Sequence, residues 1–150
     1  MMQNVIEKFY QAFTDLDPET MVSCYHDDIV FEDPAFGVLK GERAKNMWRM
    51  LCESQKGENF IVEASNITSN TAHWEAHYVF SQTGRKVHNI IDAEFEFKDG
   101  KIIKHSDRFN LHKWASQALG FKGMLLGWTG FFKKKMKEQT GRLLTKFEAR

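Results

Sequence analysis

The sequence contains little of what several protein classes require. Its 150 residues include two prolines and two cysteines, Cys24 and Cys52, with no CxxC pair. Reduced thiols in a cytosol are the simplest account of two separate cysteines, so we expect a cytoplasmic protein. The longest apolar stretch, Phe121–Phe132, is too short and too rich in glycine to span a bilayer. No signal peptide is expected, because no basic segment precedes an apolar one at the start of the chain.

The sequence also lacks the common motifs for cofactors and nucleophiles. It has no GxGxxG, no Walker loop and no GxSxG, and neither cysteine lies in a nucleophile motif. We therefore expect no cofactor. A chain of this length is expected to form one domain. Its apolar content of 42%, with 13% aromatic residues, fits a globular protein with a large core.

The net charge of +1 hides a strong asymmetry. Residues 1–110 hold 12 Lys/Arg against 18 Asp/Glu, whereas residues 111–150 hold 9 against 2. An acidic body with a basic tail suggests that the tail docks on its own body, on a partner or on an anionic surface. The aromatic residues of the tail do not interleave with its lysines, which argues against nucleic-acid binding.

Apolar periodicity and turn residues predict an α-α-β-α-β-β-β-β order. Helices are expected over residues 3–15, from Pro18 to about His26, and over Glu42–Ser54; strands are expected over Ile29–Pro34, Phe60–Thr68, Ala72–Gln82, Lys86–Lys98 and Lys101–Asn110. Asp17-Pro18-Glu19 is a helix-start signal, Gly37–Gly41 is a predicted loop, and Asp99-Gly100 is the strongest hairpin signal.

The tail predicts one amphipathic helix over residues 121–147. Its large apolar side chains share one face and its glycines gather on the opposite side: the apolar set is Phe121, Leu125, Trp128, Phe132, Met136, Leu143 and Phe147. Each interior glycine costs about 1 kcal/mol of helix stability, so we expect the apolar stripe to dock on the body or on a second subunit. Peripheral membrane contact through residues 121–150 is the less favoured alternative.

The stretch Ile29–Gly37 is the first candidate site. An apolar run ends there in two carboxylates, a proline and an aromatic loop. Pro34 biases Asp33 toward extended geometry at the end of a strand, beside Phe36. A carboxylate beside apolar surface tends to have a raised pKa, which suits a proton carrier. The alternative is an exposed aspartate in a turn.

Tyr25–Pro34, with its Glu32-Asp33-Pro34 motif, resembles the ketosteroid isomerases and the wider NTF2-like superfamily, which includes the SnoaL-like polyketide cyclases and limonene epoxide hydrolases. The resemblance covers roughly residues 3–110. It implies an α+β cone, in which a curved antiparallel sheet wraps over three N-terminal helices and encloses a cavity. It further implies a homodimer formed through the outer face of the sheet, and Asp33 as the catalytic base.

The isomerase resemblance is incomplete at the oxyanion hole. Asp92, ahead of the Lys98–Ile102 hairpin, resembles the aspartate that donates to the oxyanion in that family. It shares strand parity with glutamates, however, so we expect it to face solvent unless a β-bulge turns it inward. Phe9 stands where the family has a tyrosine, and Tyr10 lies one residue further on. Without that donor, ketosteroid isomerase activity itself is not expected.

His105 and Asp107 form the second candidate site. Together with Ile103 and Phe109 they share one face of the last predicted strand, which we expect to face the cavity. The pattern resembles the last strand of SnoaL-like cyclases, where an aspartate acts as general acid/base. We expect Asp107, oriented by His105, to be the principal proton carrier and Asp33 its partner. The alternative is a buried His–Asp pair that braces the sheet.

His73, Glu75 and His77 alternate on one face of a strand, as ligands for zinc or iron could. The opposite face of that strand is the apolar one, so we expect these groups to be solvated and predict no metal.

These patterns favour a single-domain NTF2-like protein over residues 1–120 with a helical extension over 121–150. The favoured function is a cofactor-independent isomerase, cyclase or hydrolase that uses aspartate acid/base chemistry on a small hydrophobic molecule. The alternatives are a non-catalytic protein that binds such a molecule and a dimeric scaffold. The expected catalytic residues are Asp107, Asp33, His105 and Asp92. The residues expected to line the cavity are Phe9, Tyr10, Phe13, Phe36, Trp48 and Phe109.

Overall fold

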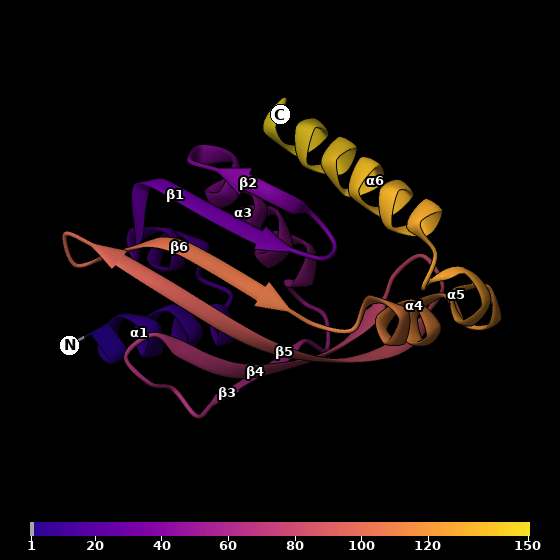
Figure 1. The fold of residues 1–150 in the computed structure, drawn as a ribbon, viewed down its shortest axis with the longest axis horizontal. Coiled ribbons are helices and arrows are strands. Elements are labelled where there is room, and N and C mark those ends of the chain that lie inside the picture. Colours follow the sequence, from indigo (N-terminus) through magenta and orange to yellow (C-terminus); the bar gives the residue numbers. More distant parts are fainter. Residues whose placement is uncertain (1) are drawn as a thin grey trace.

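The computed structural model describes residues 2–150, which form an α+β fold with a six-stranded sheet (Figure 1). In chain order the elements are α1 (Met2–Thr14), α2 (Pro18–Ser23), β1 (Tyr25–Asp33), β2 (Gly37–Lys40), α3 (Glu42–Gln55), β3 (Ile61–Ser65), β4 (Thr71–Phe80), β5 (Arg85–Lys98), β6 (Lys101–Arg108), α4 (Leu111–Leu119), α5 (Phe121–Leu126) and α6 (Gly130–Glu148).

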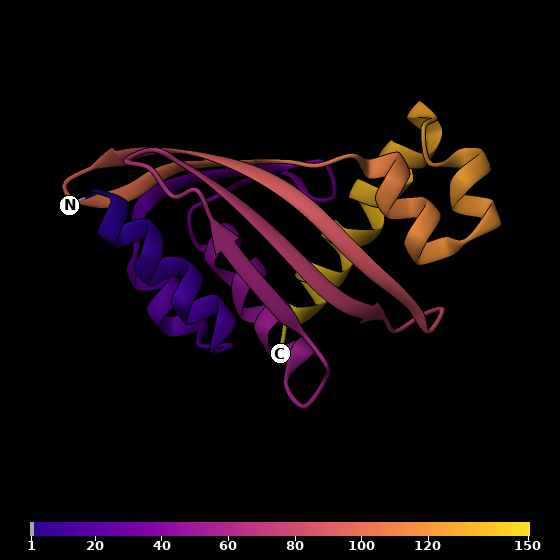
Figure 2. The same ribbon diagram turned by 90° about the horizontal axis from the view of Figure 1, so that it is seen from below.

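The sheet has the order β2-β1-β6-β5-β4-β3. It curves, and helices α1 to α3 lie against its concave side (Figure 2). The α+β cone that the sequence predicted is therefore confirmed. Neighbouring strands are antiparallel except for β1 and β6, which pair in parallel, so the sheet is mixed where we expected a fully antiparallel one.

Strand β1 begins earlier than predicted, and a short strand follows it. It starts at Tyr25 because α2 already ends at Ser23. After a tight turn the chain returns as β2, whose residues Gly37–Lys40 pair antiparallel with β1. The prediction of a loop over Gly37–Gly41 was wrong for this segment. Four residues are too few to show strand periodicity, and β2 forms because the turn returns the backbone to β1.

The core lies between the concave face of the sheet and the helices. Alternation along β5 turns Ile91, Ala93 and Phe95 inward, and α1 contributes Ile6 and Phe9 from its buried face. The hairpin between β5 and β6 forms at the predicted Asp99-Gly100 pair, whose φ angles of 55° and 75° provide the left-handed backbone that a two-residue hairpin turn needs.

The C-terminal segment differs most from its prediction. A single helix over 121–147 was expected, but the chain forms α4, α5 and α6. Asn110 caps α4 by accepting the backbone N–H of Lys113, and Thr129 caps α6 by accepting that of Phe132. Gly120, with φ of 70°, separates α4 from α5. The breaks lie at residues whose local geometry stops a helix, although the apolar spacing continues through them.

Only part of the predicted apolar stripe is docked: Phe132 and Met136 pack against the buried cluster that contains Val87 and Trp114, whereas Phe121, Leu125 and Trp128 are exposed. A Cβ atom at Gly123 would lie 1.9 Å from the carbonyl oxygen of Ala115, and one at Gly127 would lie 2.7 Å from the Ala115 Cβ. The glycine face of α5 therefore packs on α4, and the large side chains point away from it. The following six residues are largely exposed and form what we call the C-terminal apolar patch: Phe121, Met124, Leu125, Leu126, Trp128 and Phe131.

Helix α6 does contact the body, as expected of a docked tail, both through Phe132 and Met136 of the predicted stripe and through residues outside it. Leu144 is fully buried in the main core. Arg43 and Asn46 of α3 both bind the carboxylate of Glu148, and Thr140 donates to the carbonyl oxygen of Ala35. The second-subunit and membrane alternatives for the segment stay predictions. No helix within residues 2–150 has both the length and the apolarity to cross a membrane.

Candidate functional site

Strand β6 carries two ionisable side chains into the interior of the cone. His105 is 0% exposed and Asp107 is 5% exposed. Nε2 of His105 and Oδ1 of Asp107 lie 2.9 Å apart. Since residues two apart on a strand share a face, their common orientation follows from the sequence alternation.

A chain of hydrogen bonds extends from this pair across the interior. The indole N–H of Trp48 donates to the hydroxyl of Tyr25 at 2.9 Å, and that hydroxyl lies 2.7 Å from Nδ1 of His105. At the other end the indole N–H of Trp74 donates to Oδ1 of Asp107 at 3.4 Å. The network thus joins α3, β1, β6 and β4 through buried polar atoms.

The network fits a neutral His105. The Tyr25 hydroxyl already accepts from Trp48, so its own hydrogen is free to donate to Nδ1 of His105. Nε2 of the imidazole then carries the hydrogen and donates to Asp107. Burial, followed by the nearby Asp107 charge, raises the pKa of Tyr25 well above its usual value, which keeps this phenol protonated.

Asp33 ends β1 and organises the turn that follows. Its Oδ1 accepts the backbone N–H of Ala35 at 3.0 Å and that of Phe36 at 2.6 Å. The Asp33 side chain therefore stabilises a turn, which is the role that the alternative interpretation of the sequence gave it. Only Oδ1 is used, so the second oxygen of the carboxylate has no hydrogen-bond partner within residues 2–150.

The environment of Asp33 places its titration near neutral pH. Burial raises its pKa to about 7, the N–H of Phe36 opposes that rise, and the nearby Asp107 carboxylate adds to it. The parallel register explains why Asp33 and Asp107 are close. Glu32 of β1 pairs with Ser106 of β6, and Asp33 and Asp107 are the residues that follow them. Lys137 of α6 is close enough for its charge to lower the pKa of Asp33 slightly.

Tyr10 brings an unused donor to the same interior. It is 2% exposed, and its hydroxyl is the one buried side-chain polar atom in the described chain without a hydrogen-bond partner. Burial and then the Asp107 charge raise its pKa well above the usual value, so this hydroxyl stays protonated close to Asp107. Tyr10 thus provides a hydroxyl beside the position where Phe9 replaces the tyrosine of the isomerases.

The aromatic residues expected to line a cavity divide into two groups. Phe9, Phe13 and Trp48 are buried, and the rings of Phe9 and Phe13 each contact Trp48 edge to face, with centroids 5.4 and 5.1 Å away. Tyr10 packs with them against Phe9. These residues fill the interior of the cone. Phe36 is partly buried against the same core, whereas Phe109 lines an open pocket.

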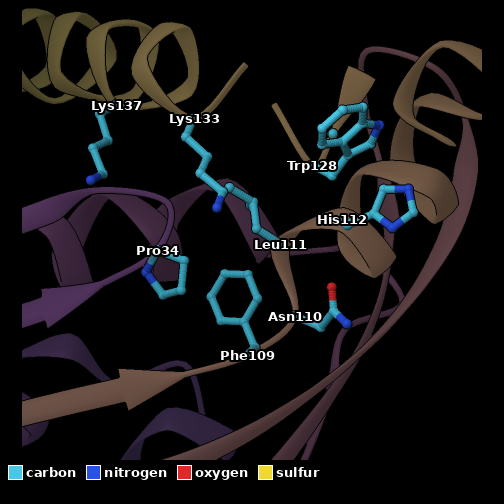
Figure 3. Close-up of a pocket in the computed structure, with 9 residues that line it drawn as sticks. Pro34, Phe109, Asn110, Leu111, His112, Trp128, Lys133 and Lys137 are labelled. Carbon is cyan, nitrogen blue, oxygen red and sulfur yellow. The ribbon is translucent and has the colours of Figure 1, made fainter. Parts of the chain in front are cut away.

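That pocket has a volume of about 410 Å³ and lies where β6 leaves the sheet (Figure 3). Its wall is made by Pro34, Phe109, Asn110, Leu111, His112, Gly127, Trp128, Lys133 and Lys137. The amines of Lys133 and Lys137 reach down from α6 toward Pro34 and Leu111. Asp33, which precedes Pro34, therefore lies next to a pocket with an apolar floor and two cationic groups on one side.

Sequence reasoning missed most of this wall. From the sequence, the lysines of α6 are only part of a basic tail, and Trp128 is only part of an apolar stripe that is expected to dock. No local signal could have found them, because their position depends on how α6 lies across the body. Only the direction of the charge asymmetry pointed to contact between the tail and the acidic body.

Asp92 does not belong to the interior site. It lies on the outer face of β5, where its Oδ1 is 3.0 Å from Nδ1 of His73, and its side chain is 66% exposed. The β5 register is regular on both sides of Asp92, so no bulge turns it inward. Asp92 therefore lies on the face that strand parity indicated, apart from Asp33, His105 and Asp107, and a catalytic role for it stays a prediction.

The comparison with known families identifies the fold family. The family model described as the SnoaL-like domain matches residues 6–105, two thirds of the chain. The chain belongs to the SnoaL-like family. This SnoaL-like region contains β1 with Asp33 and ends at His105, whereas Asp107 and helices α4 to α6 lie beyond the match. Among proteins with curated functions, none matches the chain.

Solved structures with the same fold include proteins with different descriptions. Bal32a, from a soil-derived mobile gene cassette, is 17% identical, with 77% of this chain and 95% of that one covered at a TM-score of 0.66. An LEH-like epoxide hydrolase from M. tuberculosis is 22% identical over 84% and 90% of the two chains, at a TM-score of 0.57. At these identities the likeness concerns the fold alone.

Proposed function

We propose that this SnoaL-like protein is a cofactor-independent acid/base enzyme for a small hydrophobic substrate, of the isomerase, cyclase or hydrolase class. The observation that carries the proposal is the position of Asp33, a carboxylate at the end of β1 that directly precedes Pro34 in the wall of the 410 Å³ pocket; burial raises its pKa to about 7. A group with a pKa near the working pH both takes up and releases a proton readily.

Asp33 replaces Asp107 as the proposed principal proton carrier. Asp107 is deeper, and one of its oxygens already accepts from His105 and Trp74. Asp33 is the more accessible carboxylate, and one of its oxygens has no hydrogen-bond partner among the described residues. In this mechanism Asp33 exchanges the proton with the substrate, and the neighbouring Asp107, held by His105, raises the pKa of Asp33 and so favours its protonated form.

The pocket supplies the remaining requirements of such an enzyme. Phe109, Leu111 and Trp128 offer apolar contacts to the carbon skeleton of a substrate. Lys133 and Lys137 can neutralise an oxygen that gains negative charge when a proton leaves a neighbouring carbon. One of the solved structures with the same fold is an epoxide hydrolase, and that description is consistent with chemistry on a small molecule.

A hydrogen–deuterium exchange assay tests the proposal. Five- and six-membered cyclic enones and their epoxides are incubated with the full chain in D₂O, and NMR follows exchange at carbon and ring opening. We expect turnover by the native protein and a loss of about 10²–10⁴ in rate for Asp33→Asn, because the shape stays while the acid/base group is removed. Glu32→Gln is the matched control, since this neighbouring carboxylate is exposed.

The pH profile sharpens the same test. If Asp33 acts as the base, the rate rises through about pH 7 as its carboxyl group ionises, and Asp33→Asn abolishes that inflection. Saturable binding of the same compounds without turnover, at an affinity that Asp33→Asn leaves unchanged, would instead establish the non-catalytic binding protein.

A further inference from the structure

A cluster of imidazoles and carboxylates lies on the outer face of the sheet, away from the pocket. His73, Glu75 and His77 alternate along β4, so their side chains project from one face. The antiparallel register sets His88 of β5 directly opposite His77 and Asp92 opposite His73. Two neighbouring strands thus bring five side chains with metal-ligating atoms together.

Three of these side chains converge on one point. Nε2 of His88 lies 2.6 Å from Oε1 of Glu75. The rings of His77 and His88 are stacked with their centroids 4.0 Å apart and their planes at 18°. One ligand atom from each of Glu75, His77 and His88 lies within 4.8 Å of the other two.

This spacing is close to that of a zinc site. Zinc binds imidazole nitrogen and carboxylate oxygen at about 2.0–2.2 Å in tetrahedral geometry, which sets the ligand atoms about 3.3–3.6 Å apart. To reach that spacing, Nε2 of His88 and Oε1 of Glu75 move apart from 2.6 Å and the stacked imidazoles of His77 and His88 rotate, for which these half-exposed side chains have room. The backbone is held in place, since the N–H of His88 donates to the side chain of Gln117 in α4 at 2.7 Å.

The surrounding groups orient these ligands. Nε2 of His73 lies 2.9 Å from Oε2 of Glu75, the oxygen that faces away from His88, and its Nδ1 lies 3.0 Å from Asp92. Glu63 of β3 lies 3.9 Å from Nε2 of His77. Carboxylates and imidazoles behind the ligands fix their orientation and make them more basic, as outer partners do in metal sites.

We propose that Glu75, His77 and His88 bind a Zn²⁺ ion on the outer face of the sheet, with His73 as a positioning residue. Two nitrogen ligands and one oxygen ligand suit zinc better than magnesium or calcium, which take oxygen ligands. The fourth position is open to water or to a residue of another molecule. Because β4 and β5 each supply ligands, the ion cross-links two strands and stabilises the sheet.

Competition with a chromophoric zinc chelator measures the site on the tag-free full chain after EDTA treatment. We expect one high-affinity Zn²⁺ per chain and a rise in melting temperature with added zinc, because the ion binds the folded state. His77→Ala and His88→Ala should each weaken binding by at least about 10-fold, and His73→Ala by less. His26→Ala is the matched control, because this histidine of β1 lies outside both the cluster and the pocket, and it should leave affinity unchanged.

Three results would overturn the proposal. They are no saturable binding by the native chain, affinities of His77→Ala and His88→Ala equal to that of the native chain, and several weak sites of similar strength. Glu75→Gln provides a second variant that preserves side-chain volume if an alanine variant fails to fold. Co²⁺ substitution gives an independent readout, since tetrahedral coordination produces intense visible absorption that hydrogen-bonded histidines alone do not.

Discussion

In the cone, Phe9, Phe13 and Trp48 are at most 2% exposed, whereas Phe121, Trp128 and Phe131 of the C-terminal helices are 66–69% exposed. Aromatic side chains are therefore buried in one region and exposed in the other. In the cone they fill the space under a curved sheet. In the C-terminal segment, small residues make the close contact between helices and the aromatic rings are left on the surface. Apolar periodicity identifies a face of a helix, and the packing partner decides whether that face is covered.

The two regions also differ in charge. In the cone interior, Tyr25, His105 and Asp107 are held by specific hydrogen bonds, in the chain that runs from Trp48 to Asp107. In α5 and α6, five lysines lie within residues 121–137 without any acidic residue. Two of these lysines line the pocket, so the extension completes a site whose carboxylates belong to the cone.

Replacing one tryptophan in each region should give the largest contrast in stability. Trp48→Ala should cost about 3–5 kcal/mol, because it empties a buried volume and removes a donor to Tyr25. Trp128→Ala should change stability by no more than about 0.5 kcal/mol. Urea denaturation followed by circular dichroism measures both, with Trp48→Phe as the milder core variant. Equal losses would show that Trp128 is covered in solution.

The ionisation of Asp33 should make stability depend on pH. Folding raises its pKa from an ordinary value near 3.9 to about 7, so between these pH values the folded chain keeps a proton that the unfolded chain has released. Stability should therefore fall as pH rises through this window, by at most about 4 kcal/mol. Asp33→Asn should lack this part of the slope, as denaturant midpoints from pH 4 to 8 would reveal. Parallel slopes would contradict the raised pKa.

Two adjacent leucines in α6 test which face is docked. Leu144 is fully buried and Leu143 is 46% exposed. Leu144→Ala should cost about 2–5 kcal/mol, whereas Leu143→Ala should stay within about 0.5 kcal/mol. Thermal melting measures both losses. Limited proteolysis would show whether α6 detaches from the body in Leu144→Ala, because a detached helix is cleaved more readily. The reverse order would mean that this part of α6 docks through the Leu143 side of the helix.

Two glycines give the smallest contrast. Gly123→Ala should destabilise by about 1–3 kcal/mol, because the new methyl group would meet the Ala115 carbonyl oxygen. Gly130→Ala should stabilise by about 0.4–1 kcal/mol, since nothing lies within 4 Å of its Cβ position and the unfolded chain loses freedom. Differential scanning calorimetry resolves both signs. A neutral Gly123→Ala would refute the close contact of α5 with α4.

The sequence by itself determined the body of this protein. Alternating side chains set which face of each strand is buried, so His105 and Asp107 could be assigned to the interior and Asp92 to the surface from parity alone. The turn chemistry of Asp99-Gly100 placed the hairpin between β5 and β6. These features are local, because they depend on residues within one strand or one turn.

Only the tertiary structure decided the site and the C-terminal segment. The pKa of Asp33 depends on its burial and on Asp107, 74 positions later in the numbering and adjacent only through the parallel pairing of β1 with β6. Lys137 reaches the pocket because Leu144 anchors α6 on the body. The aromatic face of α5 is exposed because Gly123 fits against Ala115. Each outcome is a contact between distant segments, which no periodicity within a single element encodes.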